Sequence, residues 1–208
     1  MKIDTALLTT TKRNSIYNKS NDFFETKKET IDILYNNYFK HKKDFSNSLV
    51  MDFSCGGYAI LNRLKELDNS ISLFGSDIYK HFDSINIKDM FESEDNIKDI
   101  DINSIHIVMN PPFNLLTKTI EYFLKLKLKY PKIKSISLLY SLRSLEGITR
   151  HNILKEYGYP SIILNMTKRQ SFNTYFDDKV NSWTPPFSCV WSIWDNNYKD
   201  FTKFTYIK

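Results

Sequence analysis

The sequence predicts an α/β fold with a doubly wound, mostly parallel sheet and an antiparallel C-terminal strand. Short apolar runs alternate with amphipathic segments of helical spacing, which is the pattern of such a sheet covered by helices. Several apolar runs lead into glycine or proline, as expected where strands enter turns. With 208 residues, 41% of them hydrophobic, the chain suits one compact domain with a full core.

Residues 1–22 are polar and are expected to form a loose arm, which leaves residues 23–208 for a single domain. Six apolar runs are predicted strands: 49–53, 71–74, 105–109, 136–140, 161–166 and 189–194. Helical spacing predicts helices from residue 26 onward and at 59–67, 115–130 and 148–157. Thr26 with Glu29 has the form of a capping box at the start of the first helix.

Composition narrows the class of protein. Two cysteines indicate no disulfide framework, and the four histidines lack zinc-ligand spacing, so no metal site is expected. The apolar runs are far shorter than a bilayer span and the N-terminus lacks the apolar region of a signal peptide, so we expect a soluble, intracellular protein with no membrane contact. The formal net charge of +5 suits a polyanionic partner without establishing one.

Three predicted strands lead directly into residues that suit ligand binding. The strand at 49–53 is followed by a turn at 54–57, the next strand ends near Asp77, and the strand at 105–109 runs into Asn110-Pro111-Pro112-Phe113. Ligands of doubly wound sheets bind beyond the carboxyl ends of the strands. We therefore expect the three segments to meet in one crevice.

The first two segments are weak signals when each is taken alone. Gly56 and Gly57 allow the backbone to approach a ligand, and the helix that follows offers free N–H groups to an anion. A simple tight turn is nevertheless the more frequent explanation of two glycines. Asp77 has the position of an acid that bonds both hydroxyls of a ribose, although capping of the next segment is also common.

Asn110-Pro111-Pro112-Phe113 is the more specific signal. The two prolines fix the backbone and leave its carbonyl groups available, and Asn110 adds an amide oxygen as an acceptor. Phe113 offers a flat ring for stacking. Such a loop presents acceptors to an amine while it holds a planar group, although a rigid turn at the end of a strand is the alternative.

This loop resembles the Asp/Asn/Ser-Pro-Pro-aromatic box of the S-adenosylmethionine-dependent amino-methyltransferases, in the form most typical of DNA adenine-N6 enzymes. The segment from Asp52 to Gly57 resembles their motif I, Asp-Pro-x-Cys-Gly-x-Gly. The resemblance implies a Rossmann-like class I methyltransferase fold and S-adenosylmethionine as the cofactor. It also implies transfer of a methyl group to the N6 amine of adenine, with nucleic acid, expected to be DNA, as the partner.

The resemblance also implies roles for individual residues. Asp77 matches the acid of motif II, residues 87–91 resemble a later cofactor-binding stretch, and residues 24–27 resemble an upstream Phe-x-Thr-Pro element. The implied cofactor-binding residues are Thr26, Asp52, Cys55, Gly56, Gly57, Asp77 and Asp89. The implied catalytic residues are Asn110, Pro111, Pro112 and Phe113.

A looser resemblance covers the later part of the chain. Residues 168–172 and the strand at 189–194 are similar to the Gly-Arg-x-x-Phe segment and final strand of phage-type DNA adenine methyltransferases. This implies that Lys168, Arg169 and Phe172 bind the substrate. A core position is an equally good interpretation of Phe172.

Two residues depart from the family pattern. Tyr58 replaces the last glycine of motif I, and Lys27 replaces the proline of the upstream element. The sequence therefore leaves open a divergent active enzyme or a binding module that has lost its cofactor. An RNA adenine-N6 or protein amino-methyltransferase is the remaining alternative, and neither the target sequence nor the oligomeric state is indicated.

Lysines are frequent after the Asn-Pro-Pro-Phe loop. They suit phosphate contacts, but a solvated helix face is the more frequent explanation of such a run. The lysines are Lys118, Lys125, Lys127, Lys129, Lys132 and Lys134.

Overall fold

The computed structural model describes residues 24–79, 85–176, 179–196 and 201–207. The predicted arm at 1–22 lies outside the described residues. Within the described ranges, every helix is too short or too polar to cross a bilayer.

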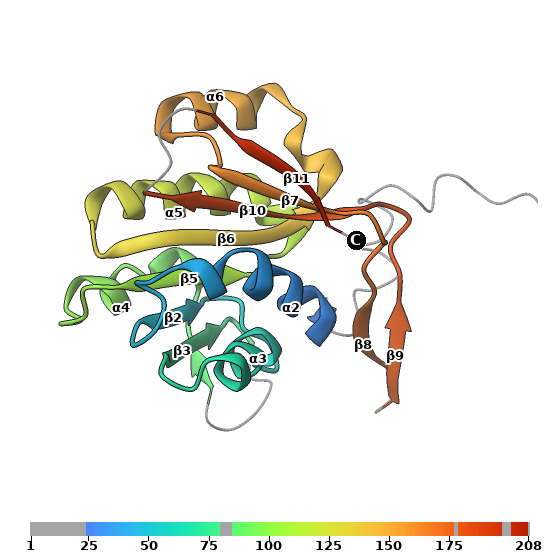
Figure 1. The fold of residues 1–208 in the computed structure, drawn as a ribbon, viewed down its shortest axis with the longest axis horizontal. Helices are drawn as coiled ribbons and strands as arrows, with labels where there is room; N and C mark the ends of the chain where they lie inside the picture. Colours follow the sequence, from blue (N-terminus) through green and yellow to red (C-terminus); the bar gives the residue numbers. More distant parts are fainter. Residues whose placement is uncertain (1–23, 80–84, 177–178, 197–200, 208) are drawn as a thin grey trace, which may run out of the picture.

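An eight-stranded sheet forms the body of the protein (Figure 1), in the order β11-β7-β10-β6-β5-β2-β3-β4. Its strands are β2 (Leu49–Asp52), β3 (Ser72–Asp77), β4 (Asn86–Ile87), β5 (Ile105–Met109), β6 (Ile133–Ser141), β7 (Ile162–Met166), β10 (Cys189–Asp195) and β11 (Lys203–Ile207). Among the described strands of this large sheet, only β10 runs antiparallel to its neighbours, β6 and β7. The predicted fold class is confirmed, but the antiparallel strand is followed by β11, which is parallel to β7.

A second, smaller sheet lies beside the carboxyl ends of the parallel strands (Figure 1). It contains β1 (Phe24–Thr26), β8 (Phe172–Phe176) and β9 (Lys179–Trp183), all antiparallel, with β8 in the middle. The capping-box prediction is therefore wrong. Thr26 belongs to β1, and the helix that follows begins at Lys28 with Lys27 as its N-cap, without a side-chain cap.

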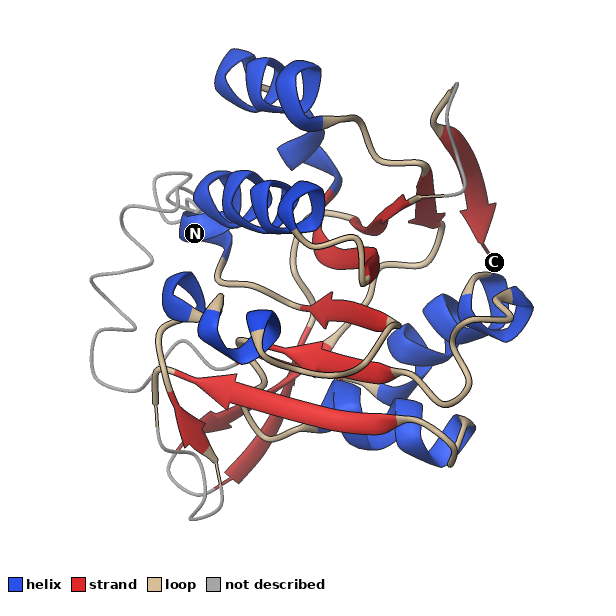
Figure 2. Ribbon diagram, turned by 90° about the vertical axis from the view of Figure 1, so that its left-hand side faces the viewer, coloured by secondary structure: helices blue, strands red, loops and turns tan. Residues whose placement is uncertain are grey.

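Helices cover both faces of the large sheet (Figure 2). On one face lie α2 (Lys28–Asn37) and α3 (Ala59–Leu67), and on the other α4 (Asp95–Lys98), α5 (Leu116–Lys129) and α6 (Ile148–Tyr157). Single 3-10 turns occur at η2 (Phe39–His41), η3 (Met90–Glu92), η4 (Phe113–Leu115) and η5 (Leu142–Leu145).

Alternate residues of the central strands enter two separate cores. Val50, Leu139 and Trp191 pack in the core that contains α2 and α3. Met51, Leu138 and Val190 pack in the core that contains α5. Because both faces of these strands are buried, their sequences are continuous apolar runs, which is why they were predictable.

The order of the strands fixes where a ligand site can form. After β2 the chain moves outward through β3 and β4, and it then returns to place β5 on the other side of β2. The carboxyl ends of β2 and β5 therefore flank the topological switch point of the sheet. Crevices for ligands form at such points in open α/β sheets.

Candidate active site

The turn after β2 is tied to the neighbouring strand β3. Gly56 has a φ of +48°, in the left-handed region that glycine tolerates. The Cys55 N–H donates to the carbonyl of Ser76 at 3.1 Å, and the Gly56 N–H donates to the Asp77 carboxylate at 2.9 Å. These contacts bring the predicted glycine turn and Asp77 together.

Two carboxyl groups lie at this turn. Asp77 also accepts from the Tyr79 N–H at 3.1 Å, and Asp52 accepts from the Ser54 N–H at 2.9 Å. Burial, together with the charge of Asp77, raises the pKa of Asp52 to about 8, and the Ser54 hydrogen bonds oppose this shift. Burial, with these two carboxylates nearby, also raises the pKa of the Cys55 thiol, so Cys55 is unsuited to act as a nucleophile.

Tyr58 occupies the position where the family pattern has a glycine, and its backbone has the conformation that glycine favours. Its φ is +65°, one of two positive values among the described residues other than glycine. The Tyr58 hydroxyl donates to the Gly75 carbonyl at 3.0 Å, so the ring is tied to β3. A Cβ on Gly75 would lie 2.4 Å from Cζ of Tyr58, so only glycine leaves room for this ring.

The side-chain amide of Asn110 is held from its nitrogen end. Nδ2 donates to the Phe24 carbonyl and to the Thr26 hydroxyl oxygen, both at 3.2 Å. A carbonyl only accepts, so these contacts fix which end of the amide faces β1. Oδ1 is thereby directed away from β1, at the carboxyl end of β5.

An aromatic residue that was not predicted faces the Asn-Pro-Pro-Phe loop. The rings of Phe113 and Phe187 meet edge to face, with centroids 5.9 Å apart. Phe187 ends a second Pro-Pro-Phe segment, Pro185-Pro186-Phe187, between β9 and β10. This repetition is a signal in the sequence that identifies Phe187 as a partner of the loop.

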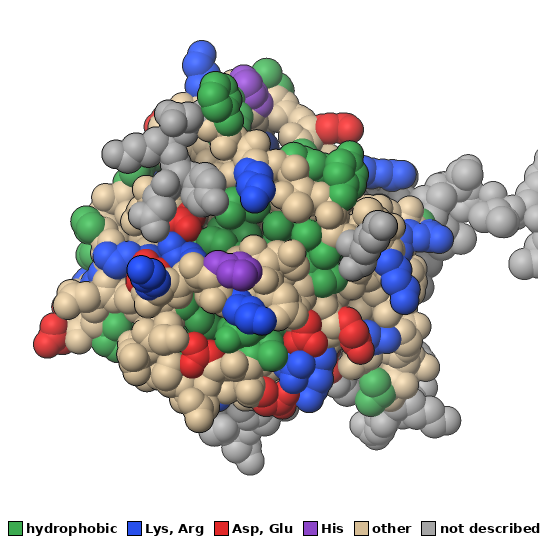
Figure 3. All heavy atoms as spheres, in the orientation of Figure 1, with side chains coloured by type: hydrophobic (Ala, Val, Ile, Leu, Met, Phe, Trp, Pro, Cys, Tyr) green, Lys and Arg blue, Asp and Glu red, His purple; other side chains and the backbone are tan. Residues whose placement is uncertain are grey.

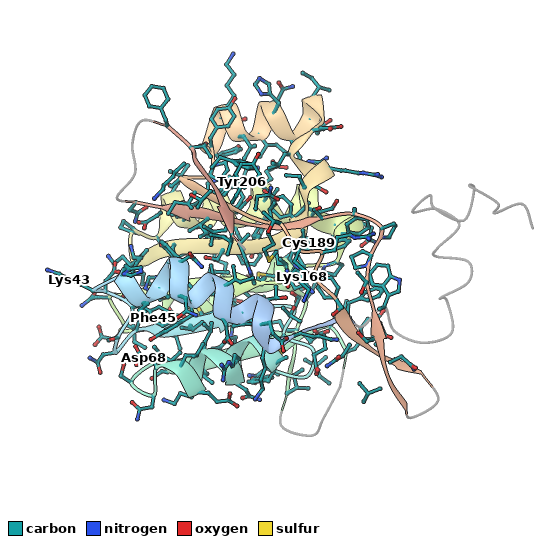
Figure 4. The ribbon with its side chains drawn as sticks, turned by 45° about the vertical axis from the view of Figure 1, so that its right-hand side comes forward. Lys43, Phe45, Asp68, Lys168, Cys189 and Tyr206 are labelled. Atoms are coloured by element: carbon teal, nitrogen blue, oxygen red, sulfur yellow. The ribbon has the colours of Figure 1, made fainter. Side chains whose placement is uncertain are left out.

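Phe172 is a buried core residue. It is 1% exposed, with its ring 6.5 Å from that of Phe24 and 6.3 Å from that of Trp183. Lys168 and Arg169, in contrast, are exposed after β7 and form no ion pair with any described residue. Lys168 lies near Cys189, whereas Lys43, Phe45 and Asp68 lie at the other end of the sheet (Figure 4).

Asp89 caps the 3-10 turn η3, where its carboxylate accepts from the Phe91 N–H at 2.9 Å. It follows β4, which pairs with the end of β3 at Asp77. Ile78, next to Asp77, is 57% exposed and was not predicted as a site residue. An apolar side chain left in water beside a polar site is suited to cover the flat face of a ligand.

The lysines between residues 118 and 134 make contacts within the protein. Lys118 lies 3.7 Å from the centre of the Phe91 ring, Lys125 pairs with Glu121, and Lys129 pairs with Glu94. Lys127 donates to Asn196, Lys132 to the carbonyls of Lys98 and Ile100, and Lys134 to that of Pro131. Helix α5 starts near the Asn-Pro-Pro-Phe loop and is about 20 Å long. Its last lysines therefore lie at the amino ends of the parallel strands, away from the loop.

The face of the molecule on which α2 and α3 lie carries charges of both signs (Figure 1 and Figure 3). On the face of the molecule in Figure 3, acidic and basic side chains are interspersed and do not form one basic patch. The contacts that the lysines of α5 make within the protein favour the solvated-face interpretation over phosphate contact. Among the described residues, no three His, Cys, Asp or Glu side chains are grouped as metal ligands.

Comparison with known proteins supports the fold. The sequence matches no protein-family model and no curated protein. The structure is similar to a type I restriction-modification methyltransferase subunit from Streptococcus thermophilus (TM-score 0.58, 12% identity, 88% of this chain and 47% of that one). It is also similar to LlaBIII, an ATP-dependent type ISP restriction-modification enzyme bound to DNA (TM-score 0.51, 11% identity, 96% and 20%).

This chain thus spans about half of the first of these proteins and a fifth of the second. At such low identity the likeness concerns the fold, which is the Rossmann-like fold of S-adenosylmethionine-dependent methyltransferases. The fold implied by the sequence resemblance is confirmed.

The fit between Tyr58 and Gly75 predicts a coupled pair of substitutions. Gly75→Ala forces the Tyr58 ring to move and is expected to lower the free energy of unfolding by roughly 1–3 kcal/mol. In a Tyr58→Gly background the same change should cost little, because the ring is gone. Urea unfolding of the single and double variants measures the coupling. Equal costs of Gly75→Ala in both backgrounds would show that the ring does not occupy this space.

The raised pKa of Asp52 predicts a stability that depends on pH. The folded protein holds a proton up to a pH of about 8, whereas the unfolded chain releases it near 4, so stability is lost as pH rises between these values. Asp52→Asn removes this loss. The melting temperature of the variant minus that of the wild type should therefore increase from pH 5 to pH 9. The increase should be about 2–4 °C for each kcal/mol of stability that the wild type loses.

Asp101→Asn, at an exposed position, is the matched control and should show no such trend. A difference between Asp52→Asn and the wild type that stays constant from pH 5 to 9 would contradict the raised pKa.

Proposed function

We propose that this protein transfers a methyl group from S-adenosylmethionine to the N6 amine of adenine in DNA. The observation that carries the proposal is the Asn110 amide, held by its nitrogen so that Oδ1 is directed away from β1 at the switch point of the sheet. An acceptor fixed in this way is suited to an exocyclic amine. Neither a simple turn nor a general anion site requires it.

The residues at the glycine turn fit S-adenosylmethionine. This cofactor carries a positive ammonium and a positive sulfonium, and the turn contains Asp52, whose ionisation is opposed first by burial and then by the charge of Asp77. A cationic ligand relieves that cost. Asp77, which accepts a backbone N–H on each carboxylate oxygen at the end of β3, is the proposed acceptor for the ribose hydroxyls.

The proposed chemistry is direct transfer. S-adenosylmethionine would supply the methyl group from its positive sulfur: the C–S bond breaks and the neutral thioether leaves, while the amine nitrogen that forms the new C–N bond gives up one proton to solvent, so no covalent intermediate with the protein is needed. The Asn110 oxygen and the Pro111 carbonyl accept hydrogen bonds from the amine, which directs the nitrogen lone pair toward the methyl group. Most of the acceleration then comes from positioning and from preorganised dipoles.

A base in duplex DNA must leave the stack to reach this site. Phe113 is partly exposed and is the proposed stacking surface for it. Phe187 lies against Phe113 and must move or share the space when a base enters. Lys168 and Arg169 are the proposed phosphate contacts, because they are exposed near the same edge of the sheet and lack ion-pair partners among the described residues.

Removal of the Asn110 amide should abolish turnover without loss of the cofactor. Asn110→Ala is expected to reduce methyl transfer on the order of 10²-fold or more. The dissociation constant for S-adenosylmethionine, measured by calorimetry, should change less than twofold. Asn196→Ala, beyond the end of β10 at the far edge of the sheet, is the matched control. If Asn110→Ala turned over at the wild-type rate, the loop would be only a structural turn and the proposed role of Asn110 would be wrong.

A tritiated-methyl assay on duplex DNA, single-stranded DNA, RNA and protein identifies the substrate, with mass spectrometry of the nucleosides. N6-methyladenine in DNA is the expected product. Methylated adenine in RNA alone, or methylated protein alone, would replace the proposed substrate with one of the alternatives. Absence of cofactor binding in calorimetry would instead indicate a binding module.

DNA binding should weaken as salt rises, because neutralised phosphates release counterions. The double variant Lys168→Ala/Arg169→Ala should reduce the slope of log K against log salt by roughly 2, about 0.9 for each lost contact. Lys125→Ala/Lys129→Ala removes the same charge from α5 and should leave the slope nearly unchanged. Fluorescence anisotropy with labelled duplex DNA measures both, and the reverse result would assign phosphate contact to α5.

A further inference from the structure

We propose that Thr26 is a positioning residue for Asn110, and that the small sheet β1-β8-β9 sets the orientation of the catalytic amide. This inference rests on the proposed function. It differs from the cofactor-binding role that the sequence resemblance implies for Thr26, because the side chain makes its contact with Asn110.

The two contacts to Asn110 act together. The Phe24 carbonyl and the Thr26 hydroxyl oxygen each lie 3.2 Å from Nδ2, which has two hydrogens to donate. Thr26 is only 4% exposed, so water does not readily replace its hydroxyl. With both hydrogens engaged, the amide neither flips nor rotates freely. Its oxygen remains in the orientation that the amine requires.

β1 takes its own position from the hairpin of β8 and β9. Among the described strands β1 pairs only with β8, in a register that places Thr26 opposite Phe172 and Phe24 opposite Thr174. The Phe24 ring lies 5.0 Å from that of Trp183 in β9. Lys27 donates to Ser182, also in β9, at 2.7 Å.

A chain of contacts therefore leads from β9 through β1 to the amide of Asn110. The buried Phe172, which the resemblance had implied as a substrate-binding residue, lies in this chain as a support for Phe24. The same small sheet thus accounts for two residues that the resemblance placed in direct contact with ligands.

Thr26→Val tests the proposal because it keeps the shape of the side chain and removes the acceptor. We expect kcat for methyl transfer to fall about tenfold, the effect of one hydrogen bond. KM for DNA and the dissociation constant of the cofactor should stay within twofold. Thr26→Ser restores the hydroxyl and should recover most of kcat. A rise in the cofactor dissociation constant with kcat unchanged would overturn the proposal in favour of cofactor binding.

Thr30→Val is the matched control. Thr30 is 1% exposed and its hydroxyl donates to Gln170 at 2.8 Å, away from Asn110. It should lower the free energy of unfolding and leave kcat unchanged. An equal loss of kcat in Thr30→Val would show that the effect of Thr26→Val is only a loss of stability.

A second measurement does not depend on methyl transfer. In ¹⁵N-labelled protein, assigned through Asn110→Asp, the side-chain amide signals of Asn110 should shift in Thr26→Val and keep their position in Thr30→Val. Unchanged signals in Thr26→Val would overturn the positioning role. If the wild type methylates none of the substrates, the proposed reaction fails, while these signals still decide whether Thr26 holds the amide.

Discussion

The adjacency of β2 and β5 is the constraint on which the rest of the site depends. The connections that leave these two strands run in opposite directions across the sheet, so their carboxyl ends flank an opening at the switch point. One end carries the glycine turn, bonded to Asp77 through the Gly56 N–H, and the other carries Asn110. In the proposed function, the cofactor at the first end and the amine at the second meet without any rearrangement of the sheet.

The sequence predicted the strands and helices whose residues are buried in the core. The central strands are apolar on both faces, and α3, α5 and α6 follow their predicted ranges closely. The strands β1, β8, β9 and β11 were not predicted because they are short or partly exposed and carry polar residues between apolar ones. Thr26 illustrates the problem: its spacing from Glu29 suits a helix cap, yet pairing with β8 places it in a strand.

In the site, too, the residues set by local sequence were predictable and the contacts between distant segments were not. Residues at the carboxyl ends of strands, such as Asp77 and Asn110, were predictable because parallel strands bring these ends together. The contact of Asn110 with Phe24 joins residues 86 positions apart through an unpredicted strand, so no local pattern contains it. The lysines of α5 show the converse, since a run that follows the loop in sequence ends on the side of the sheet away from the loop.

Tyr58 shows how a departure from the family pattern is accommodated. A left-handed backbone costs a residue with a Cβ about 1–2 kcal/mol, and the structure keeps that backbone at Tyr58. Gly75 supplies the compensation, because its missing side chain admits the Tyr58 ring and its carbonyl accepts the hydroxyl. The turn therefore keeps the geometry that bonds Gly56 to Asp77. For this reason loss of the motif I glycine does not, by itself, argue that the cofactor site has been lost.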